Sequence, residues 1–291
     1  MNILGTGLSG LVGSRIVELM SPEFSFENLS LETGVDITKK ESVDSYFDHS
    51  DASWVFHMAA YTDVQGAESD RPKGEESAAW KVNVLATEHI VENCRKSGKK
   101  LLYVDTDYAF DGKKSSYTEA DTPNPLGWYA KTKYEGAKRV IAMGSQGLII
   151  RISNPYRAHP VGKKDFVHKI LERLQGNGTV TAPTDQIFTP TFIDDIAYAL
   201  ITLIKADASG IYHVAGGNGL SPFDAAIAIA ETFMCNKTLV TPSAFKEMFV
   251  NRAPAPQYAF LKNDKIRSLG ITMRTFVSGL QEVKKQEEMI H

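Results

Sequence analysis

Two side chains four residues apart could carry out proton transfer. Tyr129 and Lys133 stand at the ends of the segment Tyr-Ala-Lys-Thr-Lys. On a helix, residues i and i+4 share one face, so the phenol and the ammonium would be neighbours. A nearby cation stabilises a phenolate and lowers the tyrosine pKa from its ordinary value of about 10. Such a tyrosine can exchange a proton with a carbonyl or alcohol oxygen near neutral pH, so the pair indicates acid–base catalysis. As an isolated match, the same spacing is more often a solvated surface pair.

A hydroxyl group falls where it could complete this pair. Residues 100–105 form an apolar run that predicts a buried strand, and Thr106 follows it directly. In a parallel sheet, the carboxyl ends of the strands border the ligand crevice. A threonine hydroxyl there can hold the substrate oxygen, whereas the alternative is a simple turn hydroxyl. We therefore predict that Thr106 belongs with Tyr129 and Lys133, and that Asp107 and Tyr108 line the loop beyond it.

Three glycines near the N-terminus predict a site for a dinucleotide. Gly7, Gly10 and Gly13 lie between a short apolar run and an apolar helical pattern. In this setting the first glycine permits a positive φ, the second leaves room for a pyrophosphate, and the third lets the helix approach the sheet. The N–H groups at the start of the helix then face the phosphates. Gly5, Gly7 and Gly10 also fit a glycine spacing, but the register 7/10/13 places the last glycine inside the helix and is preferred.

The elements that must position these residues alternate between strands and helices. After the first strand, strands are expected at residues 27–31, 53–57, 100–105, 147–152 and 210–215, with a short extended piece at 33–38. Helices are expected at residues 39–47, 78–96, 129–140, 165–174, about 195–205 and 221–233. This alternation predicts an α/β fold, a Rossmann-like doubly wound parallel sheet. Prolines break the pattern after residue 153, which predicts a smaller, interleaved C-terminal lobe.

Composition narrows the class of protein. The chain has 291 residues, 43% hydrophobic and 23% charged, and a net charge of −3, which argues against nucleic acid as the main partner. No apolar run reaches the ~18 residues needed to span a bilayer. No signal peptide is expected, so the predicted location is cytoplasmic. Cys94 and Cys235 are expected to be reduced, buried thiols, and no metal site is predicted because metal-ligand spacings are absent from the sequence.

Several segments together resemble one family. They are residues 6–13, 59–64, 81–84, 105–112, 125–133 and 189–191, with Arg151 between the last two. In these segments the chain resembles the extended short-chain dehydrogenases/reductases, and within them the dTDP-4-dehydrorhamnose reductase group, which also includes the regulatory beta subunit of methionine adenosyltransferase. The resemblance covers nearly the whole chain and is loosest toward the C-terminus. It implies an NAD(P)-binding Rossmann domain at residues 1–153 and a mainly substrate-binding lobe at 154–291, with segments at about 190–215 returning to the first domain.

The resemblance also implies roles for individual residues. Thr106, Tyr129 and Lys133 would be the catalytic set, with Tyr129 supplying the proton, Thr106 orienting the oxygen and Lys133 holding the ribose hydroxyls of the cofactor. The residues that would contact the cofactor are Gly7, Leu8, Ser9, Gly10 and Leu11 at the phosphates, Asp36 and Ile37 at the adenine, Ala59, Ala60 and Tyr61 along its path, and Asn83 at the sheet edge. The residues that would contact the substrate are Thr106, Asp107, Tyr108 and Asn154.

Three features depart from the family pattern. Asp105 stands where the family usually has Ser before the catalytic Thr, so an extra carboxylate either alters substrate choice or caps the turn. Asn154 stands where the rhamnose reductases carry the Trp that packs on the sugar, which leaves the identity of the sugar open. Residues 70–77 form a loop longer than usual, expected to be a solvated insertion, with a homodimer contact or a substrate flap as alternatives.

The expected cofactor is NAD or NADP, with a slight preference for NAD. Glu32 lies near the spacing at which an acid accepts the ribose 2′-hydroxyl, and no Lys or Arg ends the second strand. The expected activity is reduction of the 4-keto group of a nucleotide-linked deoxysugar. Two alternatives stay open: a cofactor-binding regulatory subunit without turnover, and a nucleotide-sugar epimerase or dehydratase. A dehydratase should carry Glu beside the catalytic Thr, and Asp107 is the nearest carboxylate on that side.

Overall fold

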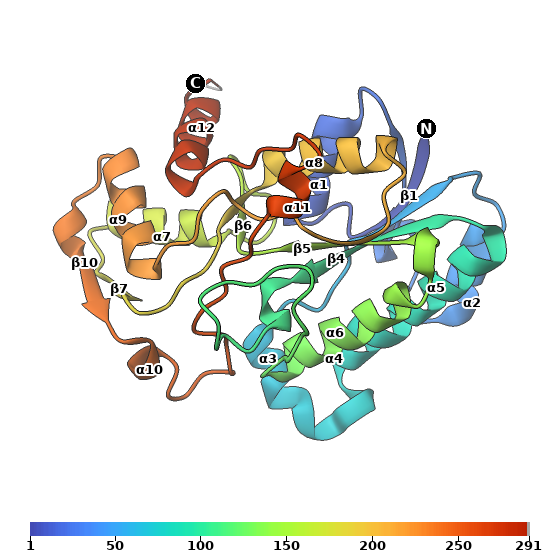
Figure 1. Cartoon of the computed structure of the whole chain (residues 1–291), viewed down its shortest axis with the longest axis horizontal. Helices are drawn as coiled ribbons and strands as arrows, with labels where there is room; N and C mark the ends of the chain where they lie inside the picture. The colour runs from blue at the N-terminus through green and yellow to red at the C-terminus, as the bar shows by residue number, and fades with distance from the viewer. Residues whose placement is uncertain (290–291) are drawn as a thin grey trace.

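A six-stranded parallel sheet forms the centre of the molecule (Figure 1). The computed structural model describes residues 1–289. The strands, in spatial order, are β2 (Ser25–Leu29), β1 (Asn2–Thr6), β3 (Trp54–His57), β4 (Lys100–Thr106), β5 (Gly147–Ile152) and β9 (Gly210–His213). Every residue of β3 and β5 is buried, as expected for strands covered on both faces. The strand order reverses between β1 and β3, the switch point where open α/β sheets bind ligands.

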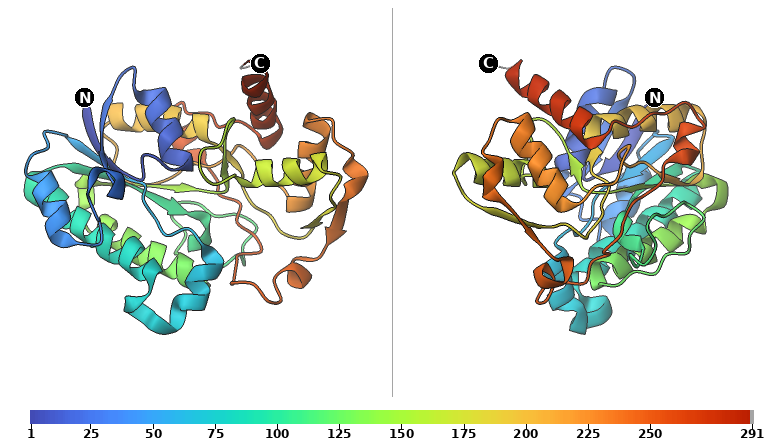
Figure 2. Two further views of the ribbon diagram at one scale, coloured as in Figure 1. Left: turned by 180° about the vertical axis from the view of Figure 1, so that it is seen from behind. Right: turned by 60° about the vertical axis from the view of Figure 1, so that its left-hand side comes forward.

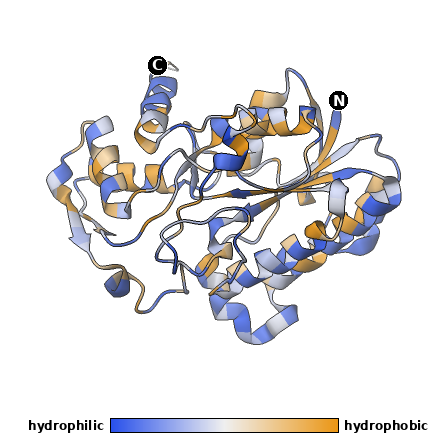
Figure 3. Cartoon of the chain, in the orientation of Figure 1, coloured by the Kyte–Doolittle hydropathy of each residue, from blue (hydrophilic) through white to orange (hydrophobic). Residues whose placement is uncertain are grey.

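Helices cover both faces of this sheet (Figures 1 and 2). On one face α1 (Leu11–Met20), α8 (Ile193–Lys205) and α11 (Asp264–Arg267) pack on one apolar core. On the other face α2 (Lys40–Phe47), α5 (Ala86–Ser97) and α6 (Trp128–Ile141) pack on a second core. Figure 3 shows hydrophobic and hydrophilic residues alternating along α5 and α6, the pattern that the 3.6-residue helical period predicts. Within residues 1–289, no helix combines the length and the apolar character needed to cross a membrane.

The second half of the chain builds a smaller lobe beside the sheet. Its elements are α7 (Phe166–Gln175), β7 (Val180–Pro183), α9 (Pro222–Thr232), β10 (Val240–Ser243), α10 (Phe245–Met248) and α12 (Phe276–Glu288). β7 and β10 pair in parallel, and a second pair joins β6 (Pro155–Tyr156) to β8 (Thr191–Phe192). Aromatic side chains, among them Tyr156, Phe192 and Phe276, fill the lobe's core. β9 and α8 belong to the main sheet layer although they follow residue 153 in the chain, and the division of the chain at that residue stays a prediction.

Most predicted elements lie within two residues of the observed ones, including the second strand, which is found at Ser25–Leu29. Three other expectations are wrong. The expected extended piece at 33–38 contains no strand; a 3₁₀ turn at Leu31–Thr33 precedes it and ends at the left-handed Gly34. The expected helix at 78–96 is divided into α4 (Ala78–Trp80), a π-helical turn at Lys81–Leu85, and α5. Both cysteines are free thiols, but Cys235 is only half-buried.

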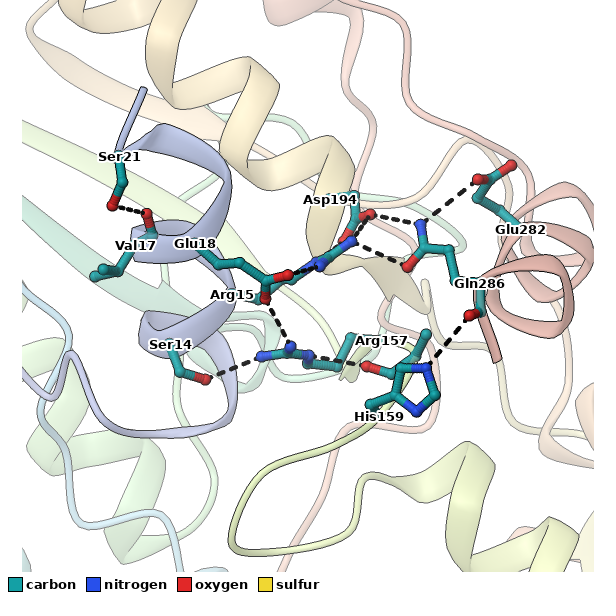
Figure 4. A network of polar contacts seen from close by, with 11 residues as sticks. Ser14, Arg15, Val17, Glu18, Ser21, Arg157, His159, Asp194, Glu282 and Gln286 are labelled. Carbon is teal, nitrogen blue, oxygen red and sulfur yellow. Dashed lines mark hydrogen bonds and ion pairs between the residues drawn. The ribbon is translucent and has the colours of Figure 1, made fainter. Parts of the chain in front are cut away.

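Ion pairs and hydrogen bonds join α12 and the rest of the lobe to α1 and α8 (Figure 4). The guanidinium of Arg15 binds both carboxylate oxygens of Asp194 on α8, at 2.7 and 2.6 Å. Gln286 on α12 donates to Asp194 at 2.9 Å and accepts from Arg15 at 3.0 Å. Arg157, in the connection after β6, donates to Ser14 and Glu18 on α1. These contacts hold the lobe against α1, the helix that follows the glycine loop.

His168 fastens α7 to α12 in a way that depends on pH. Its ring nitrogens lie 2.8 Å from Asp165 and 2.8 Å from Glu287. Burial acts to lower the pKa of His168, but the hydrogen bonds to the two carboxylates outweigh it and raise the pKa to about 9. Because the folded-state pKa exceeds the unfolded value, this stabilisation is complete below pH ~6.5 and is lost as the pH rises through about 9.

We therefore predict that the wild-type protein loses stability between pH 7 and pH 9.5, and that His168→Gln removes much of this loss. The expected difference in unfolding free energy between the two proteins at pH 7 is about 2 kcal/mol, allowing for the partial exposure of the pair. Thermal melts of both proteins across this pH range measure it. An equally steep decline in the variant would contradict the assignment.

Candidate active site

The glycine loop joins β1 to α1 with no spare room between the two. Gly7 has φ +70°, and a Cβ there would lie 2.6 Å from the backbone nitrogen of Ala59. A Cβ on Gly13 would lie 2.2 Å from the carbonyl oxygen of Gly7, so only glycine lets the helix approach this closely. Gly10 is the N-cap of α1, and neither a side-chain cap nor an acidic residue occupies the first turn. The helix start therefore fits an anionic group such as a pyrophosphate, in the register 7/10/13.

The loop after β3 lies against the glycine loop and is fixed by buried polar contacts. Thr6 Oγ1 lies 2.7 Å from His57 Nδ1 and accepts a hydrogen bond from the N–H of Ala59 at 3.2 Å. Asn83, in the π-helical turn, accepts from the N–H of Tyr61 at 2.8 Å and donates to its carbonyl oxygen at 3.3 Å. Asn83 also donates to Thr132 on α6 at 3.0 Å, so it links this loop to the helix of Tyr129.

The structure brings Thr106 and Tyr129 together. Thr106 is the last residue of β4 rather than the first residue beyond it. Its hydroxyl donates to Asp107 at 3.1 Å and accepts from the N–H of Tyr108 at 3.3 Å. It also lies close enough to the phenol of Tyr129 to act on the pKa of that group, which it lowers. The ring of Tyr108 meets that of Tyr129 edge-on, with centroids 6.0 Å apart. A hydroxyl and a phenol thus face each other at the carboxyl edge of the sheet.

Lys133 lies one helical turn from Tyr129, but its ammonium is directed toward the sheet. Its Nζ donates to the carbonyl oxygen of Val104 at 2.8 Å and sits 4.0 Å above the ring of Tyr103. Burial lowers the pKa of Lys133 to about 8. Burial also raises the pKa of Tyr129 above its ordinary value, and this effect exceeds the opposing effect of the nearby Thr106 hydroxyl. The expectation that Lys133 lowers the tyrosine pKa is therefore wrong for this structure, because removal from water dominates.

A buried chain of polar side chains leads from Thr106 to the lobe. Ser153 donates to Asp107 at 2.7 Å and accepts from the side chain of Asn154 at 3.2 Å. Asn154 has φ 42°, a conformation that asparagine adopts more readily than most residues. The structure thus places the predicted substrate residues Thr106, Asp107 and Asn154 in one network. Ser153 is a member that the sequence reasoning missed, and its place directly before Asn154 was the available signal.

The start of α6 is held by a segment that the sequence reasoning assigned to an insertion. Arg71–Glu76 form an exposed 3₁₀ helix, consistent with a solvated insertion, but Ser77 at its end is buried. Ser77 accepts from the indole N–H of Trp128 at 2.9 Å. Glu68 on α3 (Val64–Asp70) accepts from the backbone N–H of Trp128 at 2.7 Å. A carboxylate at a helix N-terminus is stabilised by the helix dipole, so Glu68 fixes the turn that carries Tyr129.

The residues expected at the adenine end lie beyond β2. Asp36 and Ile37 are half-buried in the connection to α2, where Asp36 accepts from the hydroxyl of Thr38 at 2.7 Å. Ser30 directly follows β2, beside the glycine loop, because Leu29 pairs with Thr6. The side chain of Glu32 is exposed on the 3₁₀ turn two residues farther along.

The fold and the site together define a class of protein. A glycine loop at a sheet switch point, with a threonine, a tyrosine and a lysine at the carboxyl edge of the same sheet, is typical of short-chain dehydrogenases/reductases. The family model described as RmlD substrate binding domain matches residues 1–289. The chain belongs to this family, the dTDP-4-dehydrorhamnose reductase family of extended short-chain dehydrogenases/reductases.

Individual relatives extend over nearly the whole chain. It is 31% identical over 274 residues to a dTDP-4-dehydrorhamnose reductase of Mycobacterium tuberculosis, covering 92% of this chain and 86% of that protein. A crystal structure of a dTDP-4-dehydrorhamnose reductase from Clostridium acetobutylicum matches with TM-score 0.89 and 26% identity, covering 99% of this chain and 100% of the other. The corresponding protein of Bacillus anthracis, solved in complex with NADP, matches with TM-score 0.88 and 26% identity, covering 98% and 99%.

The buried carboxylate of Asp107 gives a prediction about stability. Burial raises the pKa of Asp107 to about 6, although hydrogen bonds from Ser153 and Thr106 oppose this. A carboxyl group whose pKa is raised on folding destabilises the folded state as the pH rises from about 4 to 6, and the cost persists above that range. About two pKa units correspond to a cost of at most about 3 kcal/mol.

We therefore predict that Asp107→Asn unfolds at a higher temperature than the wild type at pH 7, and that this advantage disappears near pH 4. The amide oxygen can still accept from Ser153, so the variant is expected to fold. Thermal melts at the two pH values measure the effect. A variant less stable than the wild type at pH 7 would show that the carboxylate is better accommodated than its burial indicates.

Proposed function

We propose that this protein is an NAD(P)H-dependent reductase of the 4-keto group of a nucleotide-linked deoxysugar. The observation that carries the proposal is the proximity of the Thr106 hydroxyl to the Tyr129 phenol at the carboxyl edge of the sheet, with Lys133 on the next turn of the same helix. Membership of the dTDP-4-dehydrorhamnose reductase family supports the same reaction class. The proposed catalytic residues are Thr106, Tyr129 and Lys133.

In this proposal the substrate carbonyl oxygen lies between Thr106 and Tyr129. Tyr129 donates its proton to that oxygen, and the raised pKa of its phenol keeps the proton in place until the oxygen becomes basic. Thr106 orients the oxygen, while Asp107, Tyr108 and Asn154 contact the sugar. The reduced nicotinamide, when bound, supplies the hydride to the carbonyl carbon.

The cofactor is proposed to lie along the edge of the sheet from the glycine loop to α6. Gly7, Gly10 and their neighbours hold its phosphates at the uncapped start of α1. Lys133 has three N–H donors, of which Val104 takes one, so the others can bind the ribose hydroxyls. Ser30 rather than a carboxylate follows β2, and Glu32 is exposed, so the site accommodates either NADH or NADPH. The slight preference for NAD that the sequence suggested is therefore not part of the proposal.

Tyr129→Phe is predicted to reduce turnover by at least about 10²-fold, because it removes the proton donor. Cofactor affinity should change little, since the lost hydroxyl faces Thr106. Steady-state rates, together with the fluorescence of bound NADPH, measure the two effects separately. Turnover close to that of the wild type would exclude the phenol as the acid.

The proposal is tested by mixing the purified protein with NADH or NADPH and dTDP-4-keto-6-deoxy sugars, while the absorbance of the reduced nicotinamide is followed. Steady, substrate-dependent oxidation is the expected result. Cofactor binding without consumption for every keto-sugar would instead support a regulatory subunit. Product formation with no net change in the nicotinamide would support an epimerase or dehydratase.

A further inference from the structure

Three polar side chains form a buried row at the carboxyl edge of the sheet. Asp105 on β4 pairs in register with Arg151 on β5, which pairs with His213 on β9. Arg151 Nε donates to Asp105 Oδ2 at 3.0 Å, and both side chains have no exposed surface. Asp105 directly precedes Thr106 on β4, so this ion pair is adjacent in the chain to the proposed catalytic hydroxyl.

The pair is poorly satisfied for a buried salt bridge. In the part of the chain that the structure describes, Asp105 Oδ1, both Nη atoms of Arg151 and His213 Nε2 have no hydrogen-bond partner. The guanidinium otherwise faces the ring of Phe110, at 5.0 Å. Taking two charges out of water is costly unless every polar atom is paired, so such a pair adds little to stability. An electrostatic effect of the Asp105–Arg151 pair on neighbouring groups therefore explains its presence better than a contribution to stability does.

Asp105 points to the face of the sheet that carries Lys133. Side chains alternate along a strand, so Asp105 shares a face with Tyr103, whose ring lies beneath Lys133 Nζ. The residue between them, Val104, provides the carbonyl oxygen that Nζ binds. The charge of Asp105 opposes the effect of burial on the pKa of Lys133. A carboxylate at this place therefore favours the charged form of the lysine.

Building on the proposed function, we propose that Asp105, anchored by Arg151, is a positioning residue that keeps the ammonium of Lys133 charged and bound at Val104. The family resemblance implies a serine at this position, so the carboxylate is a feature of this chain. Asp105 acts through Lys133 and touches neither substrate nor cofactor. Replacing Asp105 by a neutral residue should therefore shift the pH dependence of cofactor binding and of kcat/KM while the protein still folds.

Most of the titratable groups around Lys133 keep one charge state between pH 5 and pH 9. The groups that face Lys133 and Asp105 are His57, Tyr103, Asp107, Tyr129, Arg151 and His213. Burial lowers the pKa values of His57 and His213 to about 3. Burial also raises the pKa values of Tyr103 and Tyr129. Asp107, with a pKa of about 6, and Lys133, with a pKa of about 8, therefore account for titration between pH 5 and pH 9 at this site.

The experiment compares the pH dependence of NADPH binding and of kcat/KM in the wild type, Asp105→Asn and Asp194→Asn. Asp194 is the matched control, because it is a buried carboxylate paired with an arginine away from the site. In Asp105→Asn the basic limb should move to lower pH by roughly one unit, while the acidic limb from Asp107 stays in place. In Asp194→Asn both limbs should keep their positions even if the melting temperature falls.

A basic limb unmoved in Asp105→Asn would overturn the inference, as would an equal movement in Asp194→Asn. If Asp105→Asn does not fold, Asp105→Ser takes its place, because it introduces the residue that the resemblance implies. The binding titration also separates the two proposals. A wild type that binds NADPH but reduces no keto-sugar contradicts the proposed function, and its basic limb still tests Asp105. Reduction with an unmoved limb contradicts only the role of Asp105.

Discussion

The proposed site depends on one constraint, the burial of a lysine ammonium against the backbone of β4. Among residues 1–289, the polar and aromatic partners of the Lys133 ammonium are one carbonyl oxygen and one ring, so its charge state is sensitive to neighbouring charges. The need to keep this buried ammonium in place explains the residues found around it. The end of β4 must be rigid, α6 must begin at a fixed place, and a counter-charge must lie close by. Thr106 and Asp105 on β4 and Glu68 on α3 meet these requirements.

Local features of the fold could be predicted from the sequence because short segments determine them. The glycine register follows from the turn and the helix that the segment must form, and the structure gives Gly7 and Gly13 the close contacts expected of them. The central strands follow from apolar runs. The third glycine, the threonine at a strand end and the tyrosine–lysine spacing all belong to this local kind of information.

Features that depend on tertiary packing could not be read in the same way. Spacing places Tyr129 and Lys133 on one helix face, but it does not show that the ammonium turns to Val104 or that burial raises the tyrosine pKa. Ser153 and Glu68 make their contacts across 46 and 60 residues of sequence, so the contacts themselves do not follow from spacing along the chain. α12 was also missed, since its apolar positions become meaningful only against the lobe that it covers.

The π-helical turn at Lys81–Leu85 has a consequence for how this protein can change. Such a turn holds one residue more than an α-helix would, and each residue rotates a helix by about 100°. Asn83 uses that rotation to reach Tyr61 on one side and Thr132 on the other. A deletion here would make the helix more regular and turn the amide away from both. The length of this segment is therefore constrained more tightly than its composition, because the position of Asn83 depends on the extra residue.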